Sequence, residues 1–170
     1  TISAHKIGGP QGIGALWIKK GIFVSPLIMG GGQESFFRAG TENIFGIVGF
    51  AEAIKSISNI EYETMLNHRK HIELELKKIG PVNVIGEEME RLPNTVCFSL
   101  TGLPSETQLV ALDLDGVGVS SGSACSSGKV GESHVLKAMG ITEEERSSTI
   151  RISFGWATTD NDINEFLKSW

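Results

Sequence analysis

The glycines of this chain constrain its fold more than any other residue type. There are 21 of them among 170 residues, roughly 12% against an average of about 7%. They cluster at residues 8–9, at 30–32 and within 116–128. Clustered glycines indicate a backbone that adopts positive φ angles or passes close to another group. Because two of these clusters precede the first strong helix pattern, we expect the chain to be a fragment of a longer protein.

Composition excludes several classes of protein. Hydrophobic residues at 40% and charged residues at 21% are typical of a globular protein. The net charge is -5 and the basic residues are scattered, which argues against a nucleic-acid or anionic-lipid partner. No apolar run reaches the roughly 18 residues of a membrane span. Two cysteines without a signal-peptide pattern predict a cytoplasmic protein without a structural disulfide.

The clearest helix pattern opens the second part of the chain. Between residues 61 and 79 apolar side chains recur every three or four positions, and Gly80-Pro81 follows as a stop signal. Beyond it the pattern predicts strands at 82–85, 95–100, 116–120 and 149–154. It predicts helices at 105–114 with Ser105 as N-cap, at 133–139 and from 160, and a capping box at 142–145. We therefore expect an α+β domain over residues 60–170.

Residues 1–59 have a different pattern. A strand is predicted at 14–20, and an apolar stretch with few charges at 43–58 predicts a buried helix. Neither element can cover the other's apolar surface. We therefore expect residues 1–59 to be the edge of a larger α/β domain, with self-association or partial disorder over residues 14–50 when the rest is missing.

Lys6 is the first candidate for chemistry. It follows Ser3 and His5 and precedes glycines and a proline that fix a tight loop. A lysine in such a setting could be partly desolvated, which favours the neutral amine that forms Schiff bases. The alternative is that His5 and Lys6 are an ordinary solvated pair.

Cys125 is the second candidate. It lies in a ten-residue stretch, 120–129, that holds five serines, two glycines and no large side chain, so its neighbours cannot bury it. Access and the nearby Lys129 are what a reactive thiol requires. The alternative is a spare surface cysteine. Cys97, among apolar neighbours, is predicted to be a small core residue.

Three other motifs lack the spacing or the partner residues that their functions require. Residues 122–129 differ from a phosphate-binding loop by one extra residue and by Val130 in place of a hydroxyl. Gly118 to Gly122 fits a nucleophile elbow, but no histidine lies beyond residue 160 to complete a triad. His68 and His71 share a helix face without further ligands, so we expect solvated histidines and no metal site.

Three segments together resemble the pyridoxal-phosphate-dependent cysteine desulfurases of the NifS/IscS-like group, in the class-V aminotransferase family. They are Ser3-x-His5-Lys6 with the glycines that follow, Gly30-Gly-Gly-Gln-Glu34 with Arg38-x-Gly-Thr-Glu-Asn43, and Ser120-Ser-Gly-Ser-Ala-Cys125. The likeness continues through 134–140 and 150–155. The resemblance implies the C-terminal part of a fold-type I transferase, with 1–59 from the large cofactor domain and 60–170 as the small domain.

The resemblance also implies roles for single residues. Lys6 would bind pyridoxal 5'-phosphate covalently, Ser3 and His5 would contact its phosphate, and Thr41 would do so across a homodimer interface. Cys125 would be the nucleophile that accepts sulfur from L-cysteine, and Arg151 would pair with the substrate carboxylate. A small, unpacked loop around Cys125 suits a thiol that must reach a substrate and then an acceptor.

The implied reaction converts L-cysteine to L-alanine and a persulfide on Cys125, which supplies sulfur through an acceptor or scaffold protein to iron-sulfur clusters or thiolated products. Family residues upstream of the lysine are absent from this chain, so we expect the 170 residues alone to be inactive. Two alternatives stay open. One is a selenocysteine lyase or related aminotransferase, which would depend less on Cys125, and the other is a non-catalytic sulfur-relay or dimerisation module.

Overall fold

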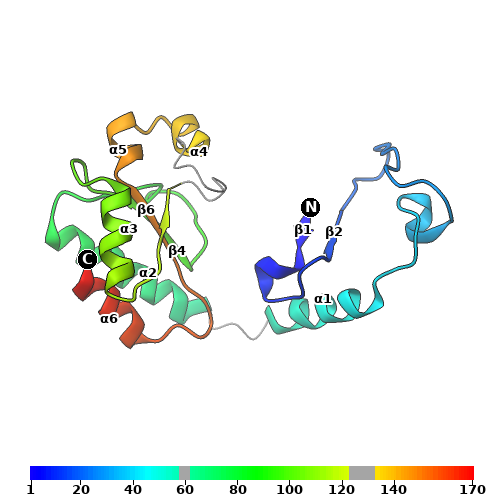
Figure 1. Cartoon of the computed structure of the whole chain (residues 1–170), viewed down its shortest axis with the longest axis horizontal. Helices are drawn as coiled ribbons and strands as arrows, with labels where there is room; N and C mark the ends of the chain where they lie inside the picture. The colour runs from blue at the N-terminus through cyan, green and yellow to red at the C-terminus, as the bar shows by residue number, and fades with distance from the viewer. Residues whose placement is uncertain (58–61, 123–132) are drawn as a thin grey trace. The chain divides into compact units, whose positions relative to one another are not determined.

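The chain divides into two compact units, residues 1–60 and 61–170 (Figure 1). The structure is a computed structural model and describes residues 1–57, 62–122 and 133–170. The first unit holds short strands, two 3-10 turns and one long helix. The second holds a four-stranded sheet and five helices among its described residues.

The first unit begins with a two-stranded ribbon. β1 (Ile2–Ser3) pairs antiparallel with β2 (Gly14–Ala15), and the 3-10 turn η1 (Ala4–Ile7) follows β1. A Cβ on Gly14 would lie 2.5 Å from the Ile2 carbonyl oxygen, so this close pairing requires glycine. The predicted strand at 14–20 is wrong beyond Ala15, because β1 offers only two residues for pairing.

Helix α1 (Ile44–Ile57) confirms the helix predicted at 43–58. Its predicted burial is wrong, since only Gly46 and Phe50 are buried among its residues. The reason is that α1 packs mainly against η1 and the glycines that follow it, where a Cβ on Gly9 would lie 3.2 Å from that of Ala53. The second 3-10 turn, η2 (Gln33–Phe36), lies before α1 and buries none of its residues. The apolar residues exposed on α1 are Ile44, Phe45, Ile47, Val48, Ile54 and Ile57.

The second unit is built on an antiparallel sheet with strand order β3-β4-β6-β5. The strands are β3 (Asn83–Val84), β4 (Thr95–Ser99), β5 (Ser120–Ser121) and β6 (Thr149–Ser153). The central pair β4–β6 sets the register, with Cys97 opposite Arg151, and on its other side Arg151 faces Ser120. These three residues therefore share one face of the sheet, since side chains alternate along a strand.

The opposite face is the core. It presents Val96, Phe98, Ile150 and Ile152 to helices α2 (Tyr62–Ile79), α3 (Ser105–Leu114) and α6 (Asp160–Ser169). Trp170, at the end of α6, packs edge-on against Phe98 at 5.1 Å and donates a hydrogen bond to the buried Gln108 of α3. The unit is thus an α+β fold with α2, α3 and α6 on one side of the sheet.

Two short helices lie at one end of the sheet. α4 (His134–Ala138) begins at Ser133, whose Oγ accepts from the Leu136 N–H, and α5 (Glu143–Ser147) begins with the predicted capping box of Thr142 and Glu145. Two local predictions are wrong. Ser105 is the first residue of α3 rather than its N-cap, which is Pro104. The strand predicted from 116 starts at Ser120, because Gly116 at φ +81° still belongs to the turn that ends α3.

The prediction that His68 is solvated is also wrong. His68 lies on the buried stripe of α2 and is 7% exposed. Its Nε2 is 2.8 Å from Oδ1 of Asp160, and its ring packs edge-on against Phe154. The helical spacing of Met65, His68 and Ile72 places this histidine inside. The carboxylate of Asp160 pairs with its Nε2, whereas its buried Nδ1 has no hydrogen-bond partner among the described residues. Among the described residues, no helix is long and apolar enough to cross a membrane.

Candidate functional site

The predicted cofactor lysine lies on a single turn of the first unit. Ala4, fully buried, anchors the turn: its N–H donates to the Ile13 carbonyl, and its own carbonyl accepts from Gly8 and Gly9. Gly8, at φ +79°, closes the turn in a left-handed conformation that favours glycine. The anchored Ala4 leaves the next two side chains, those of His5 and Lys6, exposed.

The groups on this turn fit a phosphorylated aldehyde. Ser3 contributes a hydroxyl, His5 an imidazole and Lys6 an amine within four consecutive residues, and no ion pair occupies Lys6 among the described residues. An amine is the partner of a carbonyl, and a hydroxyl and an imidazole are phosphate ligands. The expected partial desolvation of Lys6 is wrong in this structure, because the N–H groups of Gly8 and Gly9 turn back to the Ala4 carbonyl and the Lys6 side chain is exposed.

Thr41 follows a loop that its neighbours hold in shape. The guanidinium of Arg38 donates to the carbonyls of Gly40 at 3.2 Å and of Thr41 at 3.5 Å, and the Gly40 N–H donates to Gln33 Oε1. Gly40 has φ +97°, a conformation that a side chain would strain. Thr41 itself is exposed, so its hydroxyl is accessible to a ligand.

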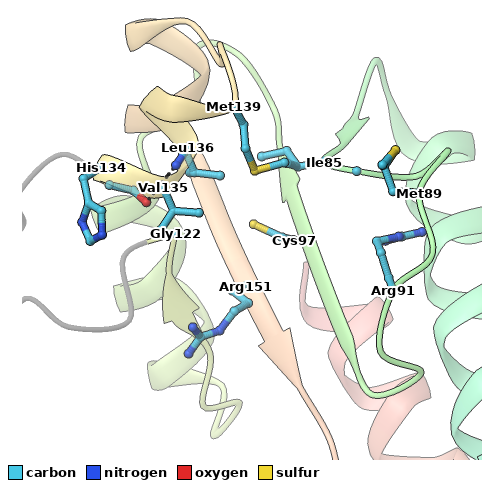
Figure 2. Close-up of a pocket in the computed structure, with 12 residues that line it drawn as sticks. Ile85, Met89, Arg91, Cys97, Gly122, His134, Val135, Leu136, Met139 and Arg151 are labelled. Atoms are coloured by element: carbon cyan, nitrogen blue, oxygen red, sulfur yellow. Dashed lines mark hydrogen bonds between the residues drawn. The ribbon is translucent and has the colours of Figure 1, made fainter. Parts of the chain in front are cut away.

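The second unit has a cavity of about 380 Å³ on the sheet face opposite α2, α3 and α6 (Figure 2). Cys97 of β4 and Arg151 of β6 line it from the sheet, Leu136 and Met139 from the α4 side, and Arg91 from the loop before β4. The described residues that line it are mostly apolar and include no Asp or Glu. Among the sequence-predicted residues it brings Arg151 and Cys97 together.

Arg151 is half-buried in this cavity. Its Nε is fully covered and makes no hydrogen bond among the described residues. A guanidinium without a carboxylate partner, beside apolar walls, is suited to binding an anionic group of a ligand. The arrangement therefore fits the role that the sequence predicts for Arg151 as a carboxylate-binding residue.

The structure describes one of the two cysteines, Cys97. Burial raises the pKa of Cys97 to about 11, although Arg151 and Arg91 partly oppose the shift, so this thiol is neutral at physiological pH. Cys97 is a small, half-buried residue and a poor nucleophile. Cys125 and Lys129 lie outside the described residues. The positions that flank their segment, Gly122 and Ser133, both line the cavity that holds Arg151.

Sequence reasoning missed a cluster of buried charges behind the cavity wall. Glu73 of α2, 8% exposed, lies 2.9 Å from Nη1 of Arg91 and 3.7 Å from Nε of Arg69. Arg69 also donates to the carbonyls of Arg91 and Leu92. The four-residue spacing of Arg69 and Glu73 on one helix was the one sequence signal for an ion pair. No sequence pattern indicated that Arg91, far along the chain, would join them. No group of three or more potential metal ligands occurs among the described residues.

Comparison with known proteins identifies the family. The sequence profile described as aminotransferase class-V matches residues 1–166, nearly the whole chain. The chain belongs to the class-V aminotransferase family. This family membership agrees with the resemblance carried by the lysine, glycine-rich and cysteine segments.

Within the class-V family, the chain is similar to cysteine desulfurases. It is 44% identical over 171 residues to cysteine desulfurase IscS of Dictyoglomus turgidum, covering 98% of this chain and 43% of that protein. It is 39% identical to a cysteine desulfurase of Cereibacter sphaeroides, covering 99% of this chain and 44% of the relative. This subgroup is pyridoxal-phosphate dependent. The chain thus spans less than half the length of these relatives.

A solved structure confirms the fold class. A NifS-like protein from Rickettsia africae is 38% identical and aligns with a TM-score of 0.85, covering 99% of this chain and 45% of that one. The expected mixed α/β architecture is therefore confirmed, over a stretch that corresponds to 45% of the NifS-like protein.

Proposed function

We propose that the protein is a cysteine desulfurase that removes sulfur from L-cysteine, giving L-alanine and a persulfide on Cys125. One observation carries the proposal. Arg151, which has no acidic partner among the described residues, and both flanks of the segment that holds Cys125 line the same cavity. A carboxylate-binding residue and a thiol-bearing segment at one cavity are what transfer of a sulfur from an amino acid requires.

Residues of the first unit would hold the cofactor. Lys6 would bind the carbonyl of pyridoxal 5'-phosphate, Ser3 and His5 would bind its phosphate, and Thr41 of a second copy would add a hydroxyl in a homodimer. When bound, the cofactor supplies an electron sink for the substrate's α-carbon. Lys6, exposed on its turn, then has the freedom to take and return a proton at that carbon.

Residues of the second unit would perform the sulfur step. Arg151 binds and orients the carboxylate of L-cysteine. Cys125 Sγ attacks the substrate sulfur, and an S–S bond forms as the substrate's C–S bond breaks. The electron pair of the broken bond stays with the carbon fragment, which takes up a proton and leaves as L-alanine. The neutral thiol of Cys97 does not compete as a nucleophile at physiological pH.

The same proposal includes a sulfur acceptor and a compartment. The persulfide would pass to an acceptor or scaffold protein that serves iron-sulfur clusters or thiolated products, in the cytoplasm. We propose that the 170 residues alone are inactive, because they span less than half the length of the cysteine desulfurases they resemble. Alanine formation by residues 1–170 at the rate of the whole protein would contradict this.

The test replaces each cysteine in turn in the whole protein supplied with pyridoxal phosphate. Cys125→Ser abolishes persulfide formation and lowers alanine formation from L-cysteine by at least 100-fold, as measured by mass spectrometry and amino-acid analysis. Cys97→Ser is the matched control and changes both rates less than threefold. Loss of cysteine activity in Cys125→Ser with full selenocysteine cleavage would instead favour a selenocysteine lyase. Unchanged function in Lys6→Ala would favour a non-catalytic sulfur relay.

A further inference from the structure

Arg91, on the loop before β4, is held from behind the cavity wall. Its Nη1 lies 2.9 Å from Oε1 of Glu73 on α2, and only 16% of the arginine side chain and 11% of the glutamate side chain are exposed. Arg69, one turn earlier on α2, lies 3.7 Å from the same oxygen and donates to the backbone carbonyls of Arg91 and Leu92. Helix α2 therefore holds both the side chain and the backbone of Arg91.

The contact between Glu73 and Arg91 depends on charge. Oε1 of Glu73 makes no hydrogen bond among the described residues, although it lies within ion-pair distance of both arginines. Glutamine has the shape of glutamate without its charge, so Glu73→Gln removes the attraction and keeps the packing. Without the carboxylate, Arg91 is a buried charge without its partner, and such a charge turns toward water or toward another anion.

Arg91 borders the same cavity as Arg151. Figure 2 shows Cys97 between Arg151 on β6 and Arg91, whose guanidinium is directed away from Cys97. Burial raises the pKa of Cys97 to about 11, and the charges of Arg151 and Arg91 partly oppose this shift, so the charge of Arg91 acts at the cavity from its present position. A second cavity of about 250 Å³ is also lined by Arg91 and Cys97. Arg91 therefore has open space beside it into which it can turn.

We propose that Glu73 determines the ligand specificity of the cavity by holding Arg91 away from it, so that Arg151 is the one arginine available and ligands with a single anionic group are selected. A second carboxylate on a ligand then meets mostly apolar walls and binds poorly. The inference rests on the proposed function for its substrate, since the L-cysteine zwitterion has one carboxylate and an uncharged side chain. Glu73 is a positioning residue, because it acts through Arg91 and does not touch the ligand.

The experiment compares two probes, butanoate with one carboxylate and glutarate with two, on the whole protein without cofactor. Ligand-observed NMR titration gives both dissociation constants. The wild type binds butanoate more tightly than glutarate, and Arg151→Met weakens butanoate binding at least tenfold. Glu73→Gln frees Arg91 for the second carboxylate, so glutarate binds at least tenfold more tightly than to the wild type, while butanoate binding changes less than threefold.

The matched control is Glu75→Gln, which removes a carboxylate that pairs with Lys78 on the same helix and leaves both dissociation constants within twofold. Adding Arg91→Met to Glu73→Gln returns glutarate binding to within twofold of the wild type, which a general loosening of the cavity would not do. Thermal unfolding checks the fold of each variant. If Glu73→Gln does not fold, the double variant Glu73→Gln/Arg69→Gln decides, because it removes one buried charge of each sign. Unchanged glutarate binding overturns the proposal, as does a wild type that binds neither probe.

Cys97 gives a second readout that needs no ligand. In a Cys125→Ser background, Glu73→Gln speeds alkylation of Cys97 by iodoacetamide at least threefold, because the freed charge of Arg91 stabilises the thiolate. Adding Arg91→Met removes most of this gain. An equally fast reaction with and without Arg91 would mean that the wall has only loosened, and it overturns the proposal.

This inference and the proposed function fail separately, because neither the titration nor the alkylation uses pyridoxal phosphate or L-cysteine. A whole protein that forms no alanine from L-cysteine, but whose Glu73→Gln variant gains affinity for glutarate, refutes the desulfurase proposal alone. A whole protein that forms alanine, but whose Glu73→Gln variant gains no affinity for glutarate, refutes this inference alone.

Discussion

Cys97 and Arg151 face each other across two strands, and their different surroundings give them different chemistry. Burial keeps the Cys97 thiol neutral, with its pKa raised to about 11, whereas the guanidinium of Arg151 has no acidic partner among the described residues. The reactive thiol of the proposed reaction must therefore come from elsewhere in the chain, and Cys125 is the other cysteine.

The raised pKa predicts slow alkylation of Cys97. In a Cys125→Ser variant at pH 8, iodoacetamide reacts with Cys97 roughly 100-fold more slowly than in the unfolded chain, since two pKa units reduce the thiolate fraction by about that factor. The folded pKa exceeds the unfolded one, so the stability from this thiol is present below pH 9 and is lost as pH rises from 9 to 11. Equal rates in the folded and unfolded protein would refute the shift.

The buried charge cluster predicts a large cost for one substitution. Glu73→Ala leaves Arg69 and Arg91 buried without their carboxylate, and removing one partner of such a pair costs about 3–5 kcal/mol. Urea unfolding of the wild type and the variant measures the loss. Glu63→Ala, at an exposed site in the first turn of the same helix, is the control and stays within about 0.5 kcal/mol. A Glu73 variant as stable as the control would contradict the account.

At the scale of elements, short helices depend on their caps. α5 has only five residues and no buried one, and its capping box joins Thr142 to Glu145, whose carboxylate also accepts from Asn83. Thr142→Ala is expected to cost about 1 kcal/mol. The Thr142 hydroxyl and then Asn83 hold the pKa of Glu145 below its usual range. This contribution is therefore present above about pH 4.5 and fades as pH falls through the lowered value.

Urea unfolding of Thr142→Ala and wild type, compared at pH 7 and pH 3, checks both statements. The difference between the two proteins shrinks at pH 3, where Glu145 binds a proton. A Ser147→Ala variant in the same helix is the control, and a difference that grows on acidification would contradict the cause given for the shift.

Elements with strong local patterns could be predicted from the sequence, and elements defined by a partner could not. α2, α3, β4 and β6 begin and end within a residue or so of their predicted bounds, because periodicity, glycine and proline mark them. The strand at 14–20 failed because its length is set by β1. His68 was misplaced because its partner Asp160 is 92 residues away. For the same reason the cavity that joins Arg151, Cys97 and Gly122 carried no sequence signal.

At the scale of the whole molecule, the two units differ in how much of their apolar surface they bury. Unit 61–170 has a sheet covered by three helices, with Phe98, Ile72, Leu76 and Ile150 fully buried. Unit 1–60 exposes Trp17, Phe23, Leu27 and Phe45 at 76–96%. Exposed apolar side chains in such numbers need a covering surface. We therefore expect residues 61–170 to fold alone and residues 1–60 to need a covering surface.

Expressed separately, residues 61–170 unfold in one cooperative transition, and residues 1–60 self-associate. Circular dichroism during thermal unfolding tests the first statement and sedimentation velocity the second. A monomeric 1–60 piece with protected amides across residues 14–50 would contradict the expectation of a unit that lacks its covering surface.

The central claim is that Lys6 binds pyridoxal phosphate in an enzyme that acts on L-cysteine. The most direct measurement is the visible absorbance of the cofactor added to the whole protein and to its Lys6→Ala variant. We predict a visible absorbance band of the lysine-bound cofactor, absent from Lys6→Ala and changed by free L-cysteine. A band of equal strength in both proteins, or in neither, would contradict the claim.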